Sequence, residues 1–394
     1  MFKVVIASDS FKGSLSSSEV ADSIEAGLKS VCPEMECVKL SVADGGEGTV
    51  EALIDTLGGR RVECIVNDPL MRKITASYAI LADGRTAVIE MAAASGLPLL
   101  SPSERNPMKT STFGTGELIL DALERGCDHF LVGIGGSATN DGGMGAFEAL
   151  GYRFLDGDGN LLHGCGESLG RVASIDCSSV CPRLADSVFI VACDVDTPFC
   201  GPDGAAYVFA PQKGASASDV EVLDGGLEHF AQVVSSCLGR NISSVPGSGA
   251  AGGLGGGFLA FSDAQLKRGV DMVLDAIDFD HIIDDVDAVV TGEGRIDSQT
   301  FKGKTPFGVM SRSRSRGVPV YAIGGCAALD GVEGIVPLMA PDIAVAYAGG
   351  GFECIIPSVS GEYDLEYVLR SDVARRNVKS VAASLAHLII EDLN

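Results

Sequence analysis

Glycine-rich loops that carry acidic, hydroxyl or basic side chains follow apolar runs at six places in the chain. The strongest pattern, residues 133–143, reads Gly-Ile-Gly-Gly-Ser-Ala-Thr-Asn-Asp-Gly-Gly between an apolar strand pattern and a helix pattern. The glycines let a phosphate approach backbone N–H groups, and the hydroxyl side chains add further donors. The pattern therefore predicts nucleotide binding by Gly135, Gly136, Ser137, Thr139 and Asn140.

Two other interpretations of this loop stay open. Residues 133–138 match the weak form of the dinucleotide fingerprint, G-x-G-x-x-A. The acidic residue expected about 20 positions later is met only by Asp156 or Asp158, which lie in a turn-like Asp-Gly-Asp-Gly-Asn stretch. A structural tight turn is the second alternative, although the run of small and polar residues is longer than a turn needs.

The first polar loop, residues 9–14, reads Asp-Ser-Phe-Lys-Gly-Ser and separates the first strand pattern from the first helix pattern. Ligands of open α/β sheets bind at such a position, and a lysine there adds a positive charge for an anion. We expect Asp9 and Lys12 to act in catalysis and Ser10 and Ser14 to contact the substrate. An ordinary Ser/Asp helix cap is the alternative.

Two further carboxylates follow apolar runs. Asp194 ends one such run, where a carboxylate can accept a hydroxyl proton or hold Mg²⁺, and we expect it to be the catalytic base or the Mg²⁺ ligand. Asp44 opens the stretch Asp-Gly-Gly-Glu-Gly-Thr and is a second candidate metal ligand. Each has a structural alternative: Asp194 could form a turn, and Asp44 with Glu47 has the spacing of a capping box.

Two cations complete the set of candidate site residues. Lys213 lies on a turn at residues 209–215 and is expected to contact the nucleotide. Arg295 and Asp297 lie in residues 292–304, which mix carboxylates, hydroxyls and an arginine after a strand, and we assign both to substrate binding. A Walker A motif is excluded because position 298, where its first glycine belongs, is serine.

Composition narrows the function classes. The 394-residue chain has a formal net charge of −24, so general nucleic-acid binding is not expected. No apolar run reaches about 18 residues, which predicts no transmembrane helix and no membrane partner. The N-terminus becomes polar at Asp9, too early for a signal peptide, and this predicts a cytoplasmic protein. The twelve cysteines lack zinc spacing, and most of them are interpreted as small core residues.

Strand and helix patterns alternate along the chain, which predicts an α/β fold with largely parallel sheets. Residues 16–31 place apolar side chains on one helical face after a serine-rich cap, and residues 263–277 are also expected to be helical. Residues 74–81 and 86–90 flank Asp-Gly, a hairpin pattern that suggests entry into a second domain. We expect one domain from residues 1–66 and 286–394, with a second α/β domain, residues 67–285, inserted.

Taken in order, these loops resemble those of the type 1 glycerate kinase family. The matching stretches span nearly the whole chain and are residues 9–14, 43–49, 133–143, 193–195, 209–215, 247–255 and 292–304. The resemblance implies phosphorylation of D-glycerate to 2-phosphoglycerate with ATP and Mg²⁺, in a cleft between two α/β domains of which the inserted one is flavodoxin-like. One departure is visible: Thr197 stands where the family usually has asparagine.

Two rival functions come from other classes. A nicotinamide-dependent hydroxy-acid dehydrogenase would use the loop at residues 133–138, but the ribose-binding acid and a usable histidine are missing. A non-catalytic small-anion binding protein would use the same loops, and the lack of an export signal weakens it. A homo-oligomer is left open.

Overall fold

The computed structural model describes residues 2–338 and 345–393. The chain forms two compact units. Unit 1 comprises Met1–Asp44, Glu51–Leu57 and Val273–Asn394, and unit 2 comprises Gly45–Val50 and Gly58–Met272. The expected boundaries after residues 66 and 285 differ from this division. Strand β3 (Gly59–Asn67) pairs along its whole length with β4 (Lys73–Leu81), so it belongs to the sheet of unit 2.

Unit 1 is built on a seven-stranded sheet with the order β14-β15-β16-β13-β12-β1-β2. Neighbours from β2 to β16 are parallel, whereas β14 and β15 form an antiparallel edge. The strands are β1 (Lys3–Ser8), β2 (Glu36–Ser41), β12 (Ala288–Ile296), β13 (Val320–Ala327), β14 (Ile335–Pro337), β15 (Tyr347–Gly349) and β16 (Phe352–Pro357).

Strand order in unit 1 reverses at β1, which has β2 on one side and β12 on the other. Read along the chain, the parallel strands have the order 2-1-3-4-5 of flavodoxin-like sheets, which bind ligands beyond the carboxyl ends of the strands at that reversal. The family resemblance implied such a sheet for the inserted domain. The structure has this order in unit 1 instead. The strands of unit 2, the inserted part, follow one another in chain order without a reversal, so its sheet is not flavodoxin-like.

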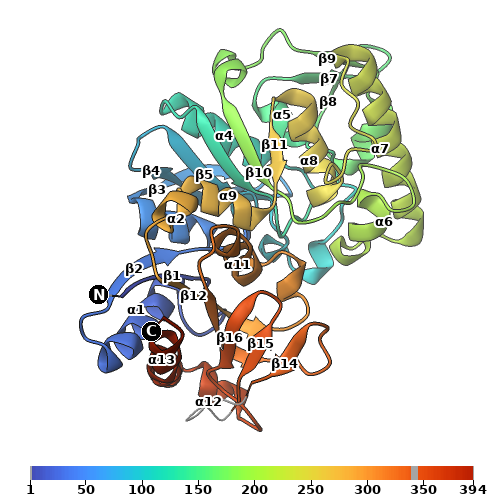
Figure 1. The fold of residues 1–394 in the computed structure, drawn as a ribbon. Coiled ribbons are helices and arrows are strands. Elements are labelled where there is room, and N and C mark those ends of the chain that lie inside the picture. The colour runs from blue at the N-terminus through green and yellow to red at the C-terminus, as the bar shows by residue number, and fades with distance from the viewer. Residues whose placement is uncertain (1, 339–344, 394) are drawn as a thin grey trace. The chain divides into compact units, whose positions relative to one another are not determined.

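Helices α1 (Ser17–Val31) and α13 (Ser371–Leu393) pack against each other in unit 1 (Figure 1). Helix α1 begins with the predicted serine cap, in which Ser16 and Glu19 form a capping box. Gly27 permits the close approach, since a Cβ there would lie 2.4 Å from the backbone oxygen of Lys379. The other helices of this unit include α10 (Phe279–Ile282), η6 (Thr300–Lys302), α11 (Thr305–Ser315) and α12 (Leu365–Leu369), while α2 (Thr49–Leu57) and α9 (Gly269–Ala276) span both units.

Unit 2 has a six-stranded sheet with the order β11-β10-β6-β5-β4-β3. The predicted hairpin is confirmed, because β4 and β5 (Thr86–Glu90) are antiparallel. The pairs from β5 to β11 are parallel, so both large sheets are mixed and mostly parallel, as the α/β class predicts. The remaining strands are β6 (His129–Gly133), β10 (Val188–Ala192) and β11 (Gln265–Lys267), with a small separate sheet of β7 (Arg153–Leu155), β8 (Leu161–Leu162) and β9 (Ser174–Asp176).

The helices of unit 2 cover an apolar core rich in aromatic rings, in which Phe147 packs against Phe258 and Phe261. The helices are α3 (Ala92–Ser95), η1 (Leu97–Leu99), η2 (Pro102–Glu104), α4 (Phe113–Glu124), α5 (Met144–Ala149), η3 (Gly166–Arg171), η4 (Pro182–Asp186), α6 (Ala205–Phe209), η5 (Pro211–Lys213), α7 (Ala217–Leu238) and α8 (Ala250–Phe261).

Candidate active site

One cavity of about 490 Å³ in unit 1 is lined by the segments that follow β1, β2 and β16 and by the carboxyl-terminal ends of β12 and β13. The cavity lies where the strand order reverses, the position at which open α/β sheets bind ligands. It brings together six residues that the sequence pointed out from distant parts of the chain. They are Asp9, Ser10, Lys12, Ser14, Asp44 and Arg295.

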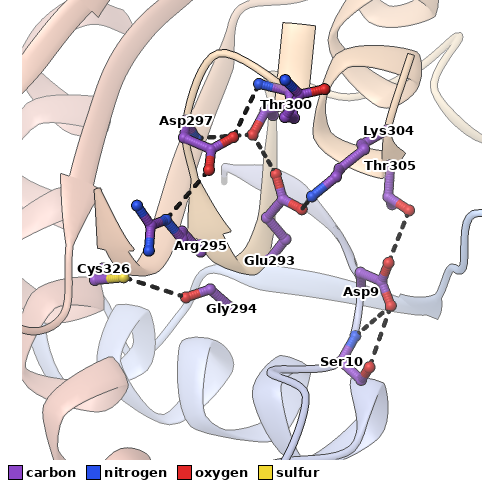
Figure 2. Close-up of polar contacts among 11 residues, drawn as sticks. Asp9, Ser10, Glu293, Gly294, Arg295, Asp297, Thr300, Lys304, Thr305 and Cys326 are labelled. Carbon is purple, nitrogen blue, oxygen red and sulfur yellow. Dashed lines mark hydrogen bonds and ion pairs between the residues drawn. The ribbon is translucent and has the colours of Figure 1, made fainter. Parts of the chain in front are cut away.

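Asp9 is the buried carboxylate of this cavity, with 7% of the residue exposed. One oxygen accepts the backbone N–H of Ser10 at 2.6 Å, and the other accepts the Thr305 hydroxyl at 3.0 Å (Figure 2). Burial, reinforced by the negative charge of Asp44, raises the pKa of Asp9 to about 6. Asp9 therefore has a fixed position and a proton affinity suited to exchanging a proton near neutral pH.

Glu293 is a second buried carboxylate here, and the sequence analysis assigned it no role. Its carboxylate accepts a hydrogen bond from the Thr300 hydroxyl (Figure 2). It also forms an ion pair with Lys304, whose Nζ lies 3.4 Å from Glu293 Oε2. Burial raises the pKa of Glu293 above its ordinary value, despite these two partners. Glu293 lies between two glycines in residues 292–304, a stretch that the sequence already marked as a candidate site. This position at the end of β12 could have identified it.

Arg295 projects from the end of β12 with a side chain that is 65% exposed. Its Nε lies 3.2 Å from a carboxylate oxygen of Asp297, and an exposed pair of this kind leaves the guanidinium accessible to an anion (Figure 2). Asp297, predicted to bind substrate, does not line the cavity. It accepts the backbone N–H of Gln299 at 2.8 Å and so shapes the turn before η6.

The loop at residues 9–14 offers several hydrogen-bond donors without a protein partner. The Ser14 hydroxyl is buried and has no partner in the part of the chain that the structure describes. Within those same residues, the backbone N–H groups of Lys12 and Gly13 also donate to no acceptor. Gly13 has a φ of +77°, so the backbone turns here in a way typical of anion-binding loops.

Unit 2 contains the predicted nucleotide loop, and Lys213 lies behind it rather than on its surface. The ammonium group of Lys213 donates to the Ser137 hydroxyl and to the backbone oxygen of Thr139, both at 2.7 Å. Lys213 is almost fully buried, and burial lowers its pKa to about 7. In this conformation Lys213 supports the loop from within and does not present its charge to a ligand.

Asp141 supports the same loop from its other end. Its carboxylate accepts the backbone N–H and the hydroxyl of Thr112, both at 2.8 Å, and the N–H groups of Gly143 and Gly145. A carboxylate with four donors is a rigid anchor even when it is buried. Burial nevertheless raises the pKa of Asp141 above its ordinary value. The loop is thus fixed by two buried side chains, Lys213 and Asp141.

The surface of this loop is formed by Gly135 and Gly136, which are exposed. Gly136 has a φ of +73°, a left-handed conformation that favours glycine. Behind them, Thr139 Oγ1 and both side-chain amide atoms of Asn140 are buried and have no partner among the described residues. Buried polar atoms of this kind are costly unless they are paired.

Asp194 is exposed in unit 2, beyond the end of β10. One carboxylate oxygen accepts the backbone N–H of Gly269 at 2.9 Å, at the start of α9. This contact matches the structural alternative of a capping aspartate more closely than that of a buried catalytic base.

Across residues 2–338 and 345–393, no group of three or more His, Cys, Asp or Glu side chains could hold a metal ion. Over the same ranges, no helix is long and apolar enough to cross a membrane.

Comparisons with known proteins agree on one family. The model of the glycerate kinase family matches residues 4–388. The chain is 47% identical to a glycerate kinase from Bacillus subtilis over 97% of each chain. It is 49% identical to the glycerate 2-kinase of Escherichia coli, over 82% of this chain and 85% of the relative.

A solved structure gives the same result. A crystal structure of a candidate glycerate kinase 2 from Salmonella typhimurium LT2 matches with a TM-score of 0.88 and 41% identity, over 99% of each chain. The mostly parallel α/β architecture described above is therefore shared across the whole length. The chain belongs to the glycerate kinase family and is a phosphotransferase of that family.

Proposed function

We propose that this enzyme transfers the γ-phosphoryl group of ATP to the C2 hydroxyl of D-glycerate, giving 2-phosphoglycerate and ADP. One observation carries the proposal: a buried carboxylate of raised pKa, Asp9, lines the same cavity as Lys12, Lys304 and Arg295. Phosphoryl transfer to a hydroxyl requires a proton acceptor together with cations that hold anionic groups. The E. coli relative's designation as a glycerate 2-kinase supports the choice of the C2 hydroxyl.

The reaction assigns a role to each group of unit 1. Arg295 grips the glycerate carboxylate, because its planar fork can donate two parallel hydrogen bonds. Lys12 and the loop at residues 9–14 bind the transferring phosphoryl group. Asp9 accepts the hydroxyl proton as the substrate oxygen bonds to the γ-phosphorus, and the bond from that phosphorus to the bridging oxygen of ADP breaks.

Unit 2 contributes the loop at residues 135–143, whose exposed glycines, Gly135 and Gly136, let the phosphates of the nucleotide approach the backbone N–H groups. Lys213 acts on this loop as a positioning residue through Ser137 and Thr139. Asp194 is retained as a candidate ligand for Mg²⁺, since an exposed carboxylate suits an ion that keeps much of its hydration.

The residues present fit Mg²⁺ bound together with a nucleotide. Mg²⁺ in kinases is held by one or two carboxylates plus substrate phosphates, so a cluster of three protein ligands is not required. Asp44 lines the same cavity as Asp9, and its negative charge contributes to the raised pKa of Asp9. The ion would neutralise charge on the phosphate chain during transfer.

The proposed function can be tested by following ADP release. Purified enzyme with ATP and Mg²⁺ should release ADP only when D-glycerate is present. ADP release that is independent of glycerate, or reduction of NAD⁺ with a hydroxy acid, would contradict the proposal.

Arg295→Lys should weaken glycerate binding by about 10-fold or more, because the fork is lost while the charge remains. Nucleotide binding should change little. Calorimetry with each ligand separately measures both effects. Equal losses for the two ligands, or no loss for either, would contradict the assignment of Arg295 to the glycerate carboxylate.

A further inference from the structure

The cavity of unit 1 is larger than the reaction chemistry described above requires. A volume of about 490 Å³ is typical of pockets that enclose drug-sized molecules, and a three-carbon acid occupies a small part of it. Beyond the charged residues, the wall of the cavity becomes apolar. This second half, called here the apolar half, is lined by Cys326, Val359, Tyr363, Leu365, Val368 and Leu369.

The apolar half keeps large side chains in contact with solvent. Tyr363 is 43% exposed, Leu365 is 60% exposed and Leu369 is 37% exposed. Leu365 and Leu369 are the two ends of the short helix α12, so one turn of helix presents both leucines to the same cavity. Large apolar side chains that are exposed together are typical of a binding surface, because folding alone would bury them.

The side chains around the apolar half indicate which class of ligand it can bind. The thiol of Cys326 lies beside the Tyr363 phenol and raises the pKa of that group. A tyrosine is neutral at physiological pH without any such shift, and its ring offers a flat aromatic face. Aromatic faces of this kind stack with nucleobases. The charged half of the same cavity supplies Lys12, Lys304 and the unpaired donors of the loop at residues 9–14. A ligand that fits both halves has a planar apolar part and an anionic part.

The position of the cavity in the fold points to the same class of ligand. Flavodoxin-like sheets bind mononucleotides at the reversal of strand order, with the phosphate on the loop after the first strand. Here that loop is residues 9–14, and the apolar half lies beyond the ends of β13 and β16, further along the same edge.

We propose that the apolar half of this cavity binds the base and ribose of the nucleotide, with Tyr363 stacking on the base and Leu365 and Leu369 covering it. The inference rests on the proposed function in one respect, that the phosphoryl donor is a nucleotide. It assigns the nucleoside of that donor to unit 1.

The test measures binding of ADP to the full-length protein without glycerate. Tyr363→Ala should weaken ADP binding by about 5- to 150-fold, the range expected for loss of one stacking contact. Tyr363→Phe keeps the ring and should bind ADP within about twofold of the unmodified protein. Inorganic tripolyphosphate has no base, so its affinity should be the same in both variants.

Tyr367→Ala is the matched control, because Tyr367 is 49% exposed on α12 but does not line the cavity. Its ring lies under the Arg370 guanidinium, 5.8 Å away. ADP binding should be unchanged in this variant. Leu365→Ala provides an independent second test and should also weaken ADP binding but not tripolyphosphate binding.

Two results would overturn the inference. ADP affinity could remain within twofold in both Tyr363→Ala and Leu365→Ala, or the Tyr367→Ala control could lose ADP affinity to the same extent. Failure of the proposed reaction is recognised separately. A protein that binds ADP in a Tyr363-dependent manner but does not phosphorylate glycerate keeps this inference and refutes the reaction. A protein that phosphorylates glycerate but binds ADP independently of Tyr363 supports the reaction and refutes this inference.

Discussion

Asp9→Asn should reduce turnover by about 10²- to 10⁴-fold, the range expected for loss of a general base. In the unmodified enzyme kcat/KM should fall as the pH drops below about 6, because the buried Asp9 carboxyl then becomes protonated and cannot accept the hydroxyl proton. The residual activity of the variant should lack this acidic limb. Steady-state kinetics between pH 5 and pH 8 measure both effects.

The same variant should not lose stability at alkaline pH. The pKa of Asp9 is about 6 in the folded protein and lower in the unfolded chain, so burial of this group favours folding at low pH. That contribution to the free energy of unfolding is lost as the pH rises through 6. At higher pH the buried charged carboxylate lowers the free energy of unfolding by roughly 3 kcal/mol. Asparagine removes this cost, and the unfolding temperature at pH 8 should therefore be equal or higher.

Asp287→Asn is the control for this experiment. Asp287 is exposed at the other end of β12, where its carboxylate accepts the backbone N–H of Lys3 at 2.7 Å. The same chemical change there should leave turnover unaltered. Near-normal turnover in Asp9→Asn, or an unchanged acidic limb, would remove Asp9 from the mechanism and return attention to Asp194.

Gly136→Val should raise the KM for ATP by about 10-fold or more and leave the KM for glycerate nearly unchanged. Gly136 has a φ of +73°, which a β-branched side chain rarely adopts, and the added Cβ alone would lie 3.4 Å from Ala92 Cβ. The loop must then shift or the side chain must cover the backbone that the phosphates approach. Steady-state kinetics and ADP calorimetry measure the effect.

A matched glycine separates backbone strain from loss of the binding surface. Gly84 lies in the hairpin of unit 2 with a φ of +70°, and a Cβ there would meet nothing within 4 Å. Gly84→Val carries the same strain, about 1–3 kcal/mol, but lies outside the loop. If both variants raise the KM for ATP equally, the loop at residues 135–143 is structural and the proposed phosphate contacts are wrong.

Elements with a strong local pattern were predictable from the sequence. The apolar spacing of Val20, Ile24 and Leu28 and the serine cap predict α1, and all three side chains are fully buried in the structure. The turn between β4 and β5 was also predictable from a local pattern, because the dipeptide Asp-Gly between two apolar runs is typical of a hairpin. Strand β11 was missed within an expected helix over residues 263–277, because three residues carry no period that distinguishes a strand.

The candidate site was predictable in part. Asp9, Lys12 and Arg295 could be grouped in advance, because each follows a strand pattern and parallel strands bring their carboxyl ends to one edge. The burial of Lys213 could not be foreseen, since it depends on how η5 packs behind the loop at residues 135–143. Tyr363 and the apolar half were missed because exposure of apolar side chains depends on tertiary packing.

The central claim, transfer of a phosphoryl group from ATP to the C2 hydroxyl of glycerate, is tested most directly by the structure of the product. The enzyme is incubated with D-glycerate, ATP and Mg²⁺, and the phosphorylated acid is identified by ³¹P and ¹H NMR. We expect 2-phosphoglycerate, with phosphorus coupled to the single proton at C2. Phosphorus coupled instead to the two protons at C3 would identify 3-phosphoglycerate, and that result would contradict the account.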